Sequence, residues 1–186
     1  IAAYEHTQKE YLICGNGAAD LIFSLCRAQN PKKALLLAPT FAEYEQALVS
    51  VGCEIARYYL EETADFCVRE DYLQILQKEK PDIIFLCNPN NPTGITMPQG
   101  LLERILRSCA KFGIFMVVDE CFLDFVREPE KHSLKKKLEE YPNLFFKIIE
   151  HSVSSIQNLF YYISFRFRCI IQAIIILFSH CPYDVR

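Results

Sequence analysis

Short aliphatic runs alternate with amphipathic helical patterns through the middle of this chain. The runs that predict buried strands are Ala34–Leu37, Ile83–Cys87 and Ile114–Val118. Helical patterns separate them: one covers Asp71–Lys80, and another runs from Pro98, which suits a first turn, to Gly113, which suits a helix end. This alternation predicts an α/β fold, with a mainly parallel sheet and helices on both faces.

Size and composition indicate an ordinary globular domain. The chain has 186 residues, of which 51% are hydrophobic and 23% charged, and its net charge is -3. That balance gives no basis for a nucleic-acid partner. The apolar stretch Cys169–Phe178 has about half the length that a membrane span needs, and charged residues interrupt the first ten positions, so we expect neither a membrane segment nor a signal peptide.

The cysteine pattern argues against a disulfide framework and against a metal site. The chain has nine cysteines, an odd number, with no C-x-x-C pair and no cysteine–histidine spacing typical of zinc. Most lie inside apolar runs, as small buried hydrophobic residues do. We therefore expect free thiols, a reducing compartment such as the cytoplasm, and no bound metal.

The first polar motif, Gly15–Asp20, lies between a short strand and the expected helix Leu21–Arg27. Small residues allow a tight turn, and a helix N-terminus offers unpaired N–H groups to an anion such as phosphate. The motif is not the dinucleotide fingerprint, because its sixth residue is Asp20 rather than glycine. Taken alone, it is also compatible with a plain strand–helix turn.

Three further motifs each follow a predicted strand. They are Pro39–Tyr44, Asn88–Gly94 and Val117–Phe125. Phe41 is an aromatic side chain able to stack on a planar ligand, although a core position is the alternative. Asn91 lies in a rigid proline-rich turn, and Asp119 ends an apolar strand, where a carboxylate needs a cation or donor or else caps the next turn. Ligands of parallel sheets bind at this edge.

Together and in this order, the four motifs resemble the large domain of fold-type-I pyridoxal-phosphate (PLP) enzymes. The pairing of N-P-N-N-P-T-G with an apolar strand ending in D-E is specific to the aminotransferase family and its histidinol-phosphate aminotransferase branch. Three of the motif sequences most resemble those of the threonine-phosphate decarboxylases of cobalamin biosynthesis: G-N-G-A-A, P-T-F-A-E-Y and D-E-C-F-L-D-F. The resemblance covers roughly residues 1–147.

The resemblance implies a cofactor, pyridoxal 5′-phosphate, and a role for each matching residue. Gly17, Ala18 and Ala19 match the loop whose backbone N–H groups hold the phosphate. Phe41 matches the aromatic stacked on the pyridine ring, Asn91 the asparagine bonded to the phenolic oxygen, and Asp119 the aspartate paired with the ring nitrogen. It also implies an amino acid or amino-acid phosphate as substrate, and a homodimer.

The chain departs from the family pattern in several places. Phe122 falls where many relatives carry a tyrosine that bonds the phenolic oxygen. After the strand expected at Asn143–Phe146, no Ser-Lys or Thr-Lys pair follows, so the lysine that binds the cofactor covalently is missing; Lys147 lies a few residues early and is better explained as a strand-end lysine. Compared with the family pattern, we also expect the amino-terminal arm and the small carboxy-terminal domain to be absent from these 186 residues.

From about Ile148 the pattern of the chain changes. This segment has no glycine and no amphipathic period, and it resembles out-of-frame translation. We therefore expect two regions: residues 1–147, a partial PLP-binding domain, and residues 148–186, an aberrant tail without native-like packing. No catalytic residue is assigned, and the chain by itself is expected to be inactive.

Two alternatives belong to other classes of function. One is a non-catalytic module, derived from such an enzyme, that binds a phosphate ligand or a partner; retention of Asn91 and Asp119, whose roles concern the cofactor ring, argues against it. The other is a nucleotide-binding oxidoreductase, which the missing glycine fingerprint disfavours.

Overall fold

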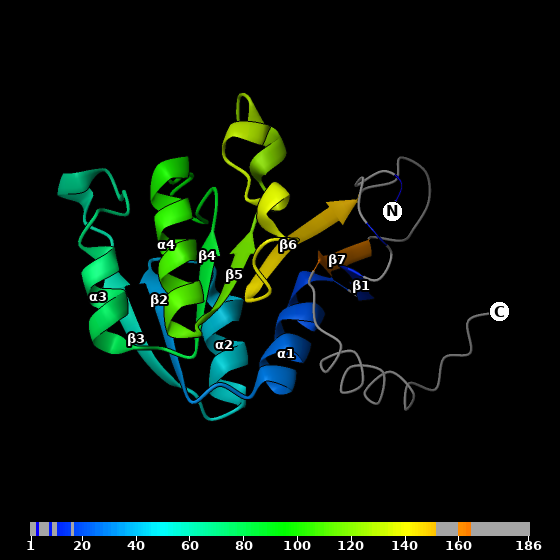
Figure 1. Ribbon diagram of the computed structural model, residues 1–186, viewed down its shortest axis with the longest axis horizontal. Coiled ribbons are helices and arrows are strands. Elements are labelled where there is room, and N and C mark those ends of the chain that lie inside the picture. Colours follow the sequence, from blue (N-terminus) through cyan, green and yellow to red (C-terminus); the bar gives the residue numbers. More distant parts are fainter. Residues whose placement is uncertain (1–2, 4–7, 9–10, 16, 152–159, 165–186) are drawn as a thin grey trace.

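The computed structural model describes residues 3, 8, 11–15, 17–151 and 160–164, with the backbone alone described from residue 145 onward. The main elements can be followed in Figure 1. In chain order they are β1 (Leu12–Gly15), α1 (Ala18–Gln29), β2 (Lys33–Ala38), α2 (Ala42–Ser50), β3 (Glu54–Tyr59), η2 (Glu62–Ala64), α3 (Tyr72–Glu79), β4 (Ile83–Cys87), α4 (Gln99–Phe112), β5 (Phe115–Asp119), η3 (Leu123–Phe125), η4 (Pro129–Lys131), η5 (Lys135–Lys137), β6 (Leu144–His151) and β7 (Phe160–Ser164).

The strands form one seven-stranded sheet in the order β1-β7-β6-β5-β4-β2-β3. Neighbours from β3 to β6 pair in parallel, and β7 pairs antiparallel with both β6 and β1. Two antiparallel pairings in succession give β1 the direction of β6. The predicted α/β class with a mainly parallel sheet is confirmed.

The predicted elements agree closely with the observed ones. β4 has the predicted bounds, while β2 and β5 differ from theirs by a residue at each end. Gly113 ends α4 in the left-handed conformation, with φ 70°, as a helix-ending glycine does. Pro98 lies one position before the helix, at its N-cap, rather than inside the first turn.

Each face of the sheet has its own apolar core. Along a strand, alternate side chains point to opposite faces. In β2, Leu35 and Leu37 pack against α3 and α4, whereas Ala34 and Leu36 pack against α1 and α2. The buried side chains of α4 lie in the first of these cores, whereas Phe112, which the helical period predicts on the same face, is 44% exposed. The sheet is therefore covered on both faces.

The carboxy-terminal part of the sheet includes residues of the predicted tail. The strand expected at Asn143–Phe146 is β6 and extends to His151, and β7 lies between β6 and β1. Residues 152–159 and 165–186 lie outside the described residues, as does the side chain of Lys147. The division into residues 1–147 and 148–186 stays a prediction.

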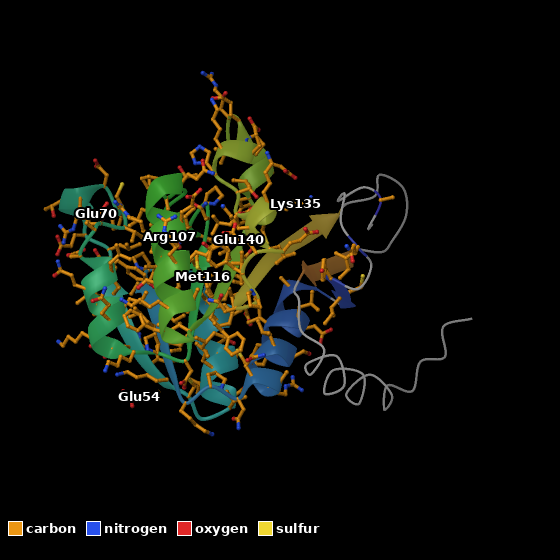
Figure 2. The ribbon with its side chains drawn as sticks, in the orientation of Figure 1. Glu54, Glu70, Arg107, Met116, Lys135 and Glu140 are labelled. Carbon is orange, nitrogen blue, oxygen red and sulfur yellow. The ribbon has the colours of Figure 1, made fainter. Side chains whose placement is uncertain are left out.

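Figure 2 draws the side chains on the ribbon, with Glu54 and Glu70 at the edge of the view. Glu54, which pairs with Lys33, and Glu70, which pairs with Arg104, extend outward, while Met116 is fully buried. No described helix is long and apolar enough to cross a bilayer. Within the same residues, no cluster of histidine, cysteine and carboxylate side chains is arranged to hold a metal ion.

Candidate functional site

The sheet topology brings all four motifs to one edge. β2, β4 and β5 run in the same direction, so the segments that follow them leave from the same side of the sheet. Phe41 follows β2, Asn91 follows β4 and Asp119 is the last residue of β5. Because β1 has this direction too, α1 also begins at that edge (Figure 1).

The start of α1 has the geometry of an anion site. Gly17 is the N-cap residue with φ 106° and ψ 162°, a backbone conformation that favours glycine. Ala18 and Ala19 are the first helical residues, whose N–H groups have no partner within a helix and lie at the positive end of its dipole. At Gly15, an added Cβ would lie 2.8 Å from Leu21 Cδ2, so a larger residue would require the Leu21 side chain to move.

Asp119 is a buried carboxylate held by two donors. Its side chain is 3% exposed. Oδ1 accepts a hydrogen bond from the Cys121 backbone N–H at 3.1 Å, and Oδ2 accepts one from Tyr44 Oη at 2.6 Å. Burial raises the pKa of Asp119, and the donors from Cys121 and Tyr44 oppose that rise.

No ion pair to Asp119 is found among the described side chains. A buried carboxylate needs a cationic or hydrogen-bonding partner, and a carboxylate has about four acceptor positions, so the two donors leave capacity for another. A protonated pyridine nitrogen would satisfy it. The residues present therefore fit the ring of pyridoxal phosphate at this place.

Tyr44 is the last residue of the P-T-F-A-E-Y motif, but it was not predicted as a site residue. It lies in the first turn of α2 and is fully buried. Its ring stacks on Phe85 with centroids 5.0 Å apart and meets Phe41 edge-on at 5.4 Å. Burial, reinforced by Asp119, raises the pKa of Tyr44 well above its ordinary value, which keeps the phenol a donor. The i, i+3 spacing of the two aromatic residues was the signal available in the sequence.

Asn90 fixes the turn that carries Asn91. Its Oδ1 accepts a hydrogen bond from Thr40 Oγ1 at 2.9 Å. Its Nδ2 donates to the Pro39 carbonyl and to Thr93 Oγ1, both at 3.1 Å. The loop after β4 is thereby bonded to the loop after β2. Asn91 itself is half-buried beside this buried network, so its position is set by its neighbour.

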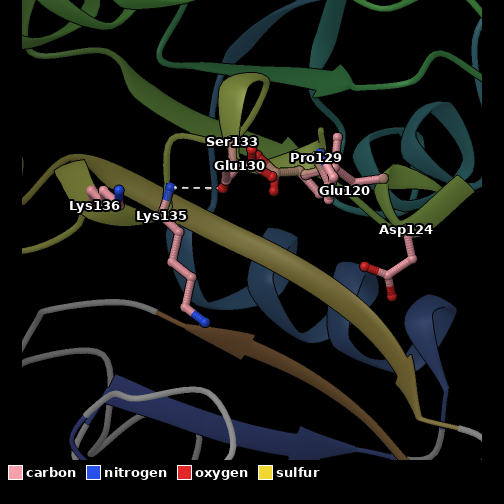
Figure 3. Close-up of a pocket in the computed structure, with 8 residues that line it drawn as sticks. Glu120, Asp124, Pro129, Glu130, Ser133, Lys135 and Lys136 are labelled. Carbon is pink, nitrogen blue, oxygen red and sulfur yellow. Dashed lines mark hydrogen bonds between the residues drawn. The ribbon is translucent and has the colours of Figure 1, made fainter. Parts of the chain in front are cut away.

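The residue after Asp119 belongs to a different environment. Glu120 is buried, and its Oε1 accepts a hydrogen bond from the Leu134 backbone N–H. A cavity of about 210 Å³ adjoins it (Figure 3), lined by Glu120, Leu123, Asp124, Pro129, Glu130, Ser133, Lys135 and Lys136. None of the predicted site residues lines this cavity. Phe122 is 45% exposed and its ring faces that of Phe125, with centroids 6.3 Å apart.

Comparison with known proteins shows the family of the chain. Residues 1–154 match the family model described as aminotransferase class I and II. The threonine-phosphate decarboxylase of Salmonella typhimurium is 33% identical over 77% of this chain and 39% of its own length. A histidinol-phosphate aminotransferase of Ruminiclostridium cellulolyticum is 33% identical over 67% of this chain and 35% of its length.

A solved decarboxylase from Sulfurospirillum multivorans superposes with a TM-score of 0.81 and 25% identity. The superposition covers all of this chain and 52% of that one. The chain thus spans less than two fifths of the length of the two curated relatives above and about half of the solved decarboxylase.

Proposed function

Since the chain belongs to the class I and II aminotransferase family, we propose that it forms the cofactor-binding part of a pyridoxal-phosphate enzyme that acts on an amino-acid phosphate ester. Enzymes of this family use pyridoxal phosphate. The named relatives, a threonine-phosphate decarboxylase and a histidinol-phosphate aminotransferase, support a phosphorylated substrate. The choice between decarboxylation and transamination stays open.

One observation carries the proposal: Asp119 is buried, bonded to two donors, and placed at the edge where Phe41 and the start of α1 also lie. Asp119 would hold a proton on the ring nitrogen, Phe41 would stack on the ring, and the backbone of Gly17, Ala18 and Ala19 would bind the phosphate. Asn91 would bind the phenolic oxygen. Bound pyridoxal phosphate supplies a ring that accepts electrons from the substrate's α-carbon.

The proposal is tested by titrating the 186-residue chain with pyridoxal phosphate and following the absorbance of the cofactor. Removing one partner of a buried charged pair costs about 3–5 kcal/mol, so Asp119→Asn should weaken binding at least a hundred-fold. Asp124→Asn removes the same charge from an exposed position a few residues away and should change affinity less than two-fold. Equal binding by the two variants would contradict the assignment of Asp119.

The phosphate site has its own control. Pyridoxal carries the same ring without the phosphate, so it should bind at least ten-fold more weakly if the start of α1 holds the phosphate. Comparable affinity for the two compounds would leave Gly17, Ala18 and Ala19 without a role.

Covalent attachment is not expected of this chain. We propose that it lacks the lysine used for attachment and for proton transfer, and that it is therefore inactive alone. Reduction with borohydride, followed by mass spectrometry, should find no cofactor on Lys147. A stable adduct there would assign that lysine the catalytic role.

Compartment and assembly are further parts of the proposal. All seven cysteines in the described residues are free thiols, which supports a reducing compartment such as the cytoplasm. The homodimer implied by the family is a prediction for the longer relatives, and sedimentation of this chain would show whether residues 1–186 are sufficient for it.

A further inference from the structure

Tyr44 is the described side chain that contacts two of the proposed cofactor residues at once. Its hydroxyl donates to Asp119 Oδ2 at 2.6 Å, and the edge-on contact of its ring with Phe41 has a centroid distance of 5.4 Å. Phe41 is the N-cap residue of α2 and Tyr44 lies three residues later. One helical turn therefore connects the residue that would stack on the ring with Tyr44, whose hydroxyl contacts the residue that would pair with the ring nitrogen.

The position of this phenol is fixed by packing. Tyr44 is fully buried, and its ring lies parallel to Phe85 of β4 within 19°, with Phe41 almost perpendicular to it. A ring held on two sides has few rotamers left, so its hydroxyl has a defined direction. The other donor to Asp119 is the Cys121 backbone N–H, which lies on a partly exposed loop and at the longer distance of 3.1 Å.

Cys87 lies beside both Asp119 and the Tyr44 hydroxyl and interacts with each of them. Cys87 lies opposite Asp119 in the pairing of β4 with β5. Burial, with Asp119 as the second cause, raises the pKa of Cys87 to about 12, so this thiol stays neutral. Its Sγ donates to the Pro89 carbonyl at 3.1 Å, which commits its proton elsewhere.

From these contacts we propose that Tyr44 is a positioning residue that orients the Asp119 carboxylate and keeps it ionised for the cofactor ring. The proposal rests on the proposed function for its biological meaning, but the hydrogen bond itself is a property of the chain alone. A donor to a carboxylate stabilises the charged form. Tyr44 thus counteracts the burial that would otherwise protonate the group needed to hold the ring nitrogen.

The first test measures Asp119 in the 186-residue chain without cofactor. The ¹³Cγ resonance of labelled aspartate reports protonation, and Asp119→Asn assigns the signal. Tyr44→Phe should raise the pKa of Asp119 by about one to two units, because a hydrogen bond to a charged group is lost. Tyr72→Phe is the matched control: it also removes a fully buried phenol hydroxyl, one without a hydrogen-bond partner among the described residues, and should leave that pKa unchanged.

A second variant keeps the test decisive if Tyr44→Phe does not fold. Fluorotyrosine placed at position 44 retains the ring and the hydroxyl but makes the phenol more acidic and a stronger donor. It should lower the pKa of Asp119. If the aspartate signal titrates at the same pH in the wild-type chain and in the fluorotyrosine chain, the hydrogen bond does not control the carboxylate and the inference is wrong.

The last arm uses pyridoxal phosphate labelled with ¹⁵N in the ring. In the Tyr44→Phe variant the nitrogen signal should move toward that of an unprotonated pyridine, since a more basic carboxylate competes for the proton. Tyr72→Phe should give the wild-type signal. Failure of the wild-type chain to bind the cofactor would count against the proposed function, whereas an unchanged Asp119 titration in the Tyr44 variants would count against the role of Tyr44.

Discussion

Each face of the sheet buries a tyrosine completely, and the two phenols differ in what their hydroxyls do. On the α1/α2 face, Tyr44 donates to Asp119; on the α3/α4 face, the Tyr72 hydroxyl has no partner among the described residues, and its ring meets Tyr58 edge-on at 5.2 Å. On the first face the buried phenol is bonded to a buried carboxylate, while on the second the buried phenol is held by ring packing. The two faces therefore differ in whether their buried phenol contacts a residue of the proposed site.

The largest effect expected from breaking this division is on the α3/α4 face. Leu102 is fully buried in α4, and Leu102→Ala should lower the free energy of unfolding by about 2–5 kcal/mol through lost packing and the cavity left behind. Urea unfolding measures it. Arg107→Ala, at an exposed ion pair on the same helix, should cost less than about 1 kcal/mol. If folded Leu102→Ala also lost cofactor affinity, the two faces would not be separable.

A smaller effect, opposite in sign, is expected at Asp119. Because its pKa is raised in the folded chain, the ionised carboxylate destabilises the fold at pH values above that pKa. Asp119→Asn should therefore raise the free energy of unfolding by about 1–3 kcal/mol at pH 7. The difference in free energy of unfolding between Asp119→Asn and the wild-type chain should shrink as pH falls through the folded pKa of Asp119. Unfolding measured at several pH values, with Asp124→Asn as control, tests this expectation. A difference between Asp119→Asn and wild type that did not change with pH would contradict it.

The neighbouring asparagines Asn90 and Asn91 allow stability and cofactor binding to be compared within the proposed site. Asn90→Ala removes the partner of Thr40 Oγ1 and two donated hydrogen bonds, so it should cost about 1–2 kcal/mol. Asn91→Ala should change stability by less than about 0.5 kcal/mol, while weakening the binding of pyridoxal phosphate. Thermal unfolding and cofactor titration measure the two effects separately. Reversed effects would show that the neighbours exchange roles.

The smallest effect is expected at Tyr72. Its hydroxyl is buried without a partner in the described structure, so Tyr72→Phe should leave the chain unchanged or stabilise it by up to about 1 kcal/mol. Urea unfolding beside Tyr44→Phe gives the direct comparison, since Tyr44→Phe should destabilise. A loss of more than 1 kcal/mol for Tyr72→Phe would show that this phenol, too, is hydrogen-bonded.

The local sequence pattern was sufficient to predict many of the helices and strands. β4 is an uninterrupted apolar run between Pro81-Asp82 and the proline-rich turn, so its bounds were predicted without error. α4 repeats its apolar residues at helical spacing and ends at a glycine. β3 was not predicted, because it is an edge strand whose side chains are mostly exposed or half-buried and show no clear alternation.

The site was predicted less completely than the fold. Phe41, Asn91 and Asp119 each follow a predicted strand, so their common edge follows from the direction of the sheet. The bond between Tyr44 and Asp119 joins residues 75 positions apart, and no local pattern records which buried phenol meets which carboxylate. The network of Asn90 was missed for the same reason, because its partners come from the loop after β2.

The pairing of the first strand with the last has a consequence for synthesis on the ribosome. β1 pairs with β7 from Leu12 opposite Ser164, about 150 residues later. At about 5–20 residues per second, the strand that leads into α1 waits about 8–30 s for its neighbour. During that interval its backbone edge is open to other nascent chains, a hazard that folding factors commonly limit. A ribosome stalled before residue 160 should therefore carry an aggregation-prone chain in which β1 lacks its partner β7.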